Sequence, residues 1–177
     1  MEAILAAAPD ALASDPDTSM AEIARQAGVV RATIYVHFPT RESLLDAVME
    51  RAVTDVAQAM TAADPQRGEP TEALERVLRA TWRELSRFHS LLAINTGRLS
   101  VEELRRRHLP MTSQLVPLIE RGQKQGVFRS DLPAGWHVAV LRAIVHTASA
   151  ELRSGRIAEV DVERVMLTTA LAAISGP

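Results

Sequence analysis

Hydrophobic positions recur along this chain at the three- and four-residue spacing of amphipathic α-helices. One such stripe consists of Leu44, Leu45, Val48, Met49, Ala52 and Val56. A second consists of Leu74, Val77, Leu78, Thr81, Trp82 and Leu85. Runs in which β-branched and polar residues alternate, the pattern of a half-buried strand, are missing from the sequence. The pattern therefore predicts an all-α protein.

Proline, glycine and aspartate residues divide the chain into about nine predicted helices. We place these helices at residues 2–13, 20–27, 31–37, 41–63, 71–89, 101–107, 110–125, 134–153 and 161–174. Pro9 lies inside the first of them, and we expect it to bend or split that helix because proline has no backbone N–H to donate.

The richest linker in the chain is DPQRGEP at residues 64–70, which carries two prolines and a glycine among charged residues. Its composition predicts a seam between two functional regions. As domains we expect residues 1–56 and residues 57–177, with the long helix at 41–63 joining them.

Residues 18–45 predict two short helices joined by a tight turn. Ser19 and Glu22 have the spacing of a capping box, in which each side chain accepts from the other residue's backbone N–H. Gly28 can adopt the left-handed conformation that ends a helix. The second helix, at 31–37, then presents arginine, threonine, tyrosine and histidine side chains to solvent. This is the layout of a helix-turn-helix, whose second helix enters the major groove of DNA.

The same segment resembles the N-terminal DNA-binding domain of the tetracycline-repressor (TetR) family of bacterial transcription regulators. The matches at the family's spacing are Ile23-Ala24, Ala27-Gly28-Val29, Thr33-Ile34-Tyr35, His37-Phe38, Arg41 and Leu44-Leu45. The resemblance in motif covers about residues 4–56, and beyond them only the helical architecture agrees. It implies a three-helix helix-turn-helix domain followed by a helical domain that binds a ligand and dimerises.

The resemblance also implies which side chains contact operator DNA. The candidate DNA-contacting residues are Arg31, Ala32, Thr33, Tyr35, His37, Thr40 and Arg41. Arg31 can donate two hydrogen bonds to guanine O6 and N7, and Ala32 can touch a thymine methyl group. The other positions, including the helix start at 40–41, suit contacts to phosphates.

Three features of the N-terminal region run against tight DNA binding. Val30 stands where the family usually has a small capping residue, so we expect the recognition helix to begin without a side-chain cap. The first helix begins almost at Met1, so either the protein has no basic arm before it or the chain has been shortened. Residues 1–63 hold nine acidic and four basic side chains, a net charge of −5, whereas residues 64–177 have a net charge of +3. An alternative function is therefore a helical small-molecule-binding protein with weak or lost DNA binding.

The second region predicts an effector cavity and a dimer interface. An apolar cavity with a few polar groups is typical of small-molecule sites, and the residues that we expect around it are Trp82, Phe88, His89, Asn95, Arg98, Met111, Leu115 and Leu141. The segments that begin at Trp136 and Val160 are apolar on more than one face and must be buried on more than one. They predict a homodimer built through the last two helices, and a monomer core is the alternative interpretation.

Composition argues against other classes of protein. The chain has no cysteine, which excludes disulfides, thiolate catalysis and cysteine-ligated metals. The histidines at 89, 108, 137 and 146 lack metal-ligand spacing, and no G-x-S-x-G motif is present. We therefore expect no catalytic residues, no metal and no cofactor, although an all-α enzyme stays as a second alternative.

No apolar run approaches the roughly 18 residues of a membrane span, and the N-terminus lacks the basic flank of a signal peptide. We therefore expect a cytoplasmic protein without membrane contact. Its expected partners are double-stranded operator DNA, a small apolar effector and a second copy of the chain. Together these features predict a ligand-responsive transcriptional repressor.

Overall fold

The computed structural model describes residues 1–87 and 101–176, which form eight helices. These are α1 (Glu2–Ser14), α2 (Met20–Gln26), α3 (Arg31–His37), α4 (Arg41–Ala62), α5 (Pro70–Arg87), α7 (Val101–Lys124), α8 (Ala134–Arg153) and α9 (Glu159–Ile174). The described residues contain no strand, only an isolated antiparallel bridge between Phe128 and Ser175. The all-α prediction is confirmed. None of the described helices combines the length and hydropathy needed to cross a bilayer.

The helices predicted separately at 101–107 and 110–125 are one helix, α7, so this prediction was wrong. Pro110 and Pro117 both lie inside α7. An interior proline removes one backbone hydrogen bond, but a helix continues through it when packing holds both sides. Here α7 packs against α4, α5 and α8. Pro9 likewise lies buried inside a continuous α1 and does not split it.

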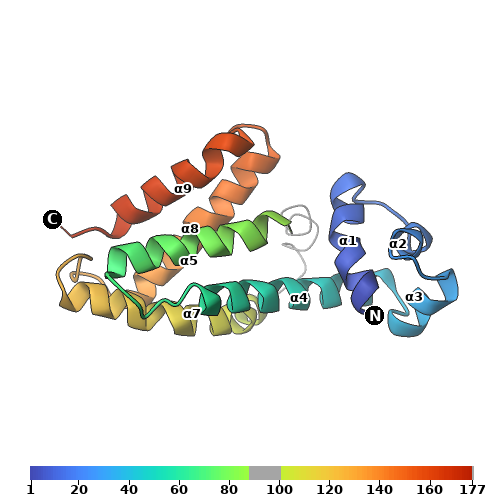
Figure 1. The fold of residues 1–177 in the computed structure, drawn as a ribbon, viewed down its shortest axis with the longest axis horizontal. Coiled ribbons are helices and arrows are strands. Elements are labelled where there is room, and N and C mark those ends of the chain that lie inside the picture. The colour runs from blue at the N-terminus through green and yellow to red at the C-terminus, as the bar shows by residue number, and fades with distance from the viewer. Residues whose placement is uncertain (88–100, 177) are drawn as a thin grey trace.

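The molecule is elongated, with α1, α2 and α3 gathered at one end and the C-terminus at the other (Figure 1). The helices at the N-terminal end enclose their own core, which includes the fully buried Ile4, Leu12, Ile23, Ile34 and Leu44. Along α4, the last buried residue of this core is Ala52. Val56, one turn later, packs instead with Met60 and Val77. One helix is thus shared between the core beneath α3 and the packing of α5 and α7.

The remaining helices build a second core around Leu74, Leu118, Ile119, Leu141 and Met166. In this part of the molecule α8 and α9 pack side by side, and α5 contacts both of them (Figure 1).

The segment at 64–70 is the turn between α4 and α5, and these two helices pack along each other. The turn therefore lies within one packed pair of helices, and the division of the chain into two functional regions stays a prediction. Two arginines hold its backbone: Arg76 donates to the carbonyl oxygen of Arg67 (2.7 Å) and Arg121 donates to that of Gly68 (2.7 Å). A proline- and glycine-rich segment marks a change of direction, and only packing decides whether the helices on either side separate.

Candidate DNA interface and effector cavity

The turn between α2 and α3 closes on backbone hydrogen bonds that need a glycine. The Val29 N–H donates to the carbonyl of Ala24 at 2.9 Å, and the Gly28 N–H donates to that of Arg25 at 3.1 Å. Gly28 has φ +69°, the left-handed region that residues with a Cβ rarely adopt. This turn sets the direction in which α3 leaves α2.

The start of α2 confirms half of the predicted capping box. The Ser19 hydroxyl accepts from the Glu22 N–H at 3.2 Å. The Glu22 carboxylate does not accept a hydrogen bond from the Ser19 N–H. It accepts instead from Arg25 (2.8 Å) and Gln26 (3.0 Å), one turn later. These hydrogen bonds, with that from Arg25 the stronger, lower the pKa of Glu22 to about 2. A charged guanidinium is a better partner for a carboxylate than a neutral backbone N–H.

Four of the predicted DNA-contacting residues lie on the exposed surface of α3, namely Arg31, Ala32, Tyr35 and His37. Ile34, in the middle of α3, is completely buried and fixes the helix to the core below. The Arg31 guanidinium lies over the Tyr35 ring, 5.7 Å from its centroid, a geometry in which the ring face attracts the cation. The exposed face of α3 thus presents Arg31, whose guanidinium contacts the Tyr35 ring, and contains no acidic residue.

Thr33 is half-buried, and the two predicted residues at the start of α4 are engaged within the protein. The Thr40 hydroxyl accepts from the Ser43 N–H at 3.1 Å, and the Ser43 hydroxyl accepts from the Thr40 N–H at 3.2 Å. The Arg41 guanidinium donates to the carbonyl oxygens of Pro16 (2.5 Å) and Thr18. Arg41 therefore ties the segment before α2 to α4, and its contact with phosphate stays a prediction.

The acidic groups of the N-terminal region lie outside α3, and some of them are paired. Arg51 on α4 forms ion pairs with Glu2 of α1 (2.6 Å) and Asp55 (2.7 Å), and Arg25 pairs with Glu22. The negative net charge of residues 1–63 therefore does not come from the exposed face of α3. The ion pairs of Arg51 also join α1 to the middle of α4.

As expected, α3 begins without a side-chain cap, because Val30 is its N-cap residue and makes no such hydrogen bond. We expect Val30→Ser to raise the free energy of unfolding by about 0.5–1 kcal/mol, since a serine hydroxyl would satisfy a free N–H of the first turn. Val30 is 71% exposed, so little packing is lost. The matched control is Val36→Ser, at a 77% exposed position inside the same helix. The free energies of unfolding are measured with urea. If both variants are stabilised equally, or neither is, this explanation is contradicted.

A small apolar cavity of about 70 Å³ lies between α4, α5, α7 and α8. The side chains that line it are Met60, Val77, Leu78, Thr81, Leu85, Met111, Thr112, Leu115, Val138, Leu141, Arg142, Val145 and His146. Met111, Leu115 and Leu141 were among the residues expected around the effector. Phe88, His89, Asn95 and Arg98 lie outside the described residues.

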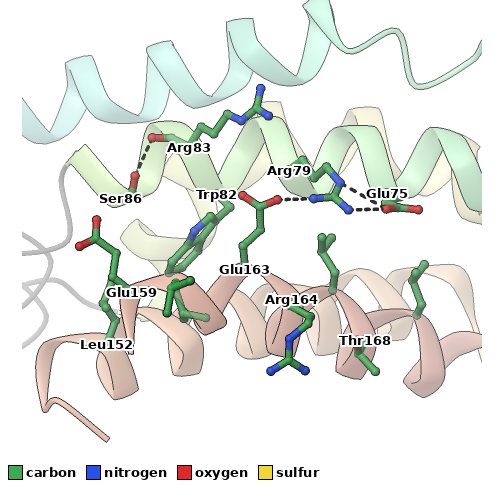
Figure 2. A pocket seen from close by; sticks show the side chains of 14 residues that line it. Glu75, Arg79, Trp82, Arg83, Ser86, Leu152, Glu159, Glu163, Arg164 and Thr168 are labelled. Carbon is green, nitrogen blue, oxygen red and sulfur yellow. Dashed lines mark hydrogen bonds and ion pairs between the residues drawn. The ribbon is translucent and has the colours of Figure 1, made fainter. Parts of the chain in front are cut away.

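Trp82 does not line this cavity, contrary to its predicted place. It lines instead a separate cleft of about 600 Å³ between α5 and α9. Figure 2 shows Trp82 reaching from α5 toward α9 beside Glu163, which forms an ion pair with Arg79; Arg79 also pairs with Glu75 (2.7 Å). Thr81 faces the cavity, and the next residue of a helix points about 100° further around its axis. Sequence analysis did not predict this cleft. The available signal was the four-residue spacing of Glu75 and Arg79, which is typical of an ion pair on one face of a helix, and both residues line the cleft.

The outer surface of α8 carries an uncharged stripe at helical spacing, made of Trp136, Val140, Ala143 and Thr147. Trp136 is 58% exposed, unusual for so large an apolar side chain. Val145, by contrast, is buried in the core of the single chain.

Within the described residues, no three histidine, aspartate or glutamate side chains come together as a metal site would require. His137 is buried, and its Nε2 lies 3.1 Å from the carbonyl oxygen of Arg129.

Comparison with known proteins finds relatives along the whole chain. Residues 4–48 match the family described as bacterial regulatory proteins, tetR family. The HTH-type transcriptional regulator NfxB of Pseudomonas aeruginosa is 29% identical over 159 residues, which are 89% of this chain and 84% of the relative. The HTH-type transcriptional repressor LfrR of Mycolicibacterium smegmatis is 28% identical over 176 residues, 99% of this chain and 90% of the relative.

The fold also matches a solved structure. The crystal structure of the TetR-like transcriptional regulator LfrR from Mycobacterium smegmatis in complex with proflavine superposes with a TM-score of 0.72 at 24% sequence identity. The match covers 99% of this chain and 97% of that chain. The likeness therefore includes the helices behind the helix-turn-helix as well as the helix-turn-helix itself.

Proposed function

Because the chain is a transcriptional regulator of the TetR family, we propose that it is a repressor that binds operator DNA as a homodimer and leaves it when a small apolar effector binds. The observation that carries the proposal is the exposed face of α3, where Arg31 lies over the Tyr35 ring in a helix without acidic residues. This helix lies within the segment that matches the family. A relative of similar length is named a repressor.

In this proposal residues 1–56 form the DNA-binding domain, and residues 57–177 form the effector and dimer domain. Arg31 and Ala32 read base edges in the major groove, while Tyr35 and His37 position phosphates. The dimer forms through the last two helices, using the uncharged stripe of α8. A bacterial regulator of this kind works in the cytoplasm, on double-stranded DNA.

The route from cavity to DNA runs through α4. Met60 of α4 and Met111 of α7 both line the cavity. Beside it, the Gln114 amide donates to the carbonyl of Ala57 at 3.3 Å and accepts from the Thr61 hydroxyl at 3.0 Å. A ligand that enlarges the cavity would push α7 from α4 and strain these bonds. Tilting α4 changes the separation of the two recognition helices, which must be about 34 Å to enter successive major grooves.

The proposal is tested by binding to palindromic DNA from the region upstream of the protein's own gene, at several salt concentrations. We expect Arg31→Ala to cost about 1–3 kcal/mol and to relax the preference at one operator position. Tyr35→Phe should weaken binding to all sequences alike, because phosphate contacts carry no sequence information.

Equal losses of sequence preference in the two variants would contradict these assigned roles. If the wild-type protein binds no DNA even at low salt, the result favours the alternative function, a helical small-molecule-binding protein.

A further inference from the structure

The described side chains around the cavity between α4, α5, α7 and α8 include a positive charge and no negative one. Among the side chains that the structure describes, the titratable ones that line it are Arg142 and His146, and none of them is a carboxylate. These two residues are four apart on α8 and therefore lie on the same face of the helix. The rest of the lining consists of apolar side chains and two threonines. Among these described side chains a cationic ligand would meet no counter-ion, whereas an anionic ligand would meet an arginine.

Arg142 makes no ion pair or hydrogen bond with any residue that the structure describes. Other arginines of this region are paired, for example Arg129 with Asp131 (2.6 Å) and Arg156 with Glu151 (2.5 Å). Residues 88–100, outside the described part, contain no aspartate or glutamate. The planar guanidinium of an arginine matches a carboxylate with two parallel hydrogen bonds.

The apolar part of the cavity is small but adaptable. Its volume of about 70 Å³ holds only a few atoms, so a ligand must enlarge it. Met60, Met111, Leu85 and Leu115 lie around it on three helices, and the unbranched methionines repack at low cost. A narrow, flexible apolar body is the shape that such a lining accommodates most easily.

We infer that the effector is an apolar carboxylate, whose chain occupies this cavity and whose charged group is bound by Arg142 beside His146. The inference rests on the proposed function, because it takes the cavity as the effector site. It adds the charge of the ligand, which distinguishes carboxylates from amines and alcohols with the same apolar body.

Three probes with the same ten-carbon chain test the inference: decanoate, decanol and decyltrimethylammonium. Titration calorimetry with the full chain, below the concentration at which each probe forms micelles, should show decanoate binding about tenfold tighter than the cation. Arg142→Met keeps the apolar stem and removes the charge. It should weaken decanoate about tenfold and change decanol less than twofold. The matched control is Arg83→Met: this arginine lines the cleft between α5 and α9, and its loss should change neither affinity.

Equal or tighter binding of the cation would overturn the inference, and so would an Arg142→Met variant that loses decanol as much as decanoate. Operator binding measured with each probe separates this failure from that of the proposed function. If decanol or the cation releases DNA and decanoate does not, the cavity is an effector site with another charge preference. If no probe binds while the protein still binds operator DNA, both the inference and the effector part of the proposed function are wrong.

Discussion

Replacing Ala143 by glutamate is expected to convert the proposed dimer into monomers and to lower operator affinity at least a hundredfold, about 2.7 kcal/mol. Ala143 is exposed in the single chain and lies in the uncharged stripe of α8 with Trp136, Val140 and Thr147. In a twofold interface each copy presents the same patch, so every substitution enters the interface twice. A carboxylate buried there without a partner costs several kcal/mol.

Sedimentation velocity at micromolar concentration measures the assembly, and fluorescence anisotropy with labelled operator measures DNA binding. The matched control is Thr71→Glu, which adds the same charge at an exposed position in the first turn of α5. That variant should stay dimeric and keep its affinity, because a glutamate is favourable near a helix N-terminus. A wild-type protein that sediments as a monomer, or an Ala143→Glu variant that stays dimeric, would show that α8 does not form the interface.

Substituting alanine for Gly122 should destabilise the protein by about 3 kcal/mol, which lowers the melting temperature by roughly 6–12 °C. A Cβ at position 122 would lie 2.1 Å from Cδ2 and 2.4 Å from Cε2 of Phe128. The Phe128 ring is buried, and its surroundings hold it in place. The backbone N–H of Phe128 donates to the Gly122 carbonyl at 3.2 Å, and the adjacent Arg129 N–H donates to the Ile174 carbonyl at 2.9 Å. Moving the ring away would therefore break the contact between the start of the α7–α8 connection and the end of α9.

Gly135→Ala is the matched control, because a Cβ at this position of α8 meets nothing within 4 Å. The higher helix propensity of alanine should stabilise that variant by up to about 1 kcal/mol. Both melting temperatures are compared at one protein concentration, since the proposed dimerisation would make them depend on it. If Gly122→Ala melts no lower than the wild type, the ring of Phe128 moves more freely than the backbone hydrogen bonds around it suggest.

The N-terminal end of the molecule was largely predictable because its signals are local. The bounds predicted for α3 agree with the structure, since the glycine of the preceding turn and Pro39 after the helix both act on their immediate neighbours. The missing cap at Val30 also followed from the type of one residue. The candidate DNA-contacting residues on α3 could be named because they are close together in the sequence, and a helix-turn-helix exposes one face of its second helix.

Packing between distant segments decided the rest. The sequence around Pro110 predicts two helices, but contacts of α7 with α4, α5 and α8 keep a single helix through it. Trp82 belongs by spacing to the apolar stripe of α5, and only the packing of α9 beside that helix puts it in the outer cleft. Arg41 fits the family pattern, yet its partners are carbonyl groups more than twenty residues earlier. Sequence alone therefore determined most of the helical segments and indicated which helix would face DNA, because hydrogen bonds and caps act within about four residues. The partners of a side chain across helices depend on how those helices pack, which only the tertiary structure decides.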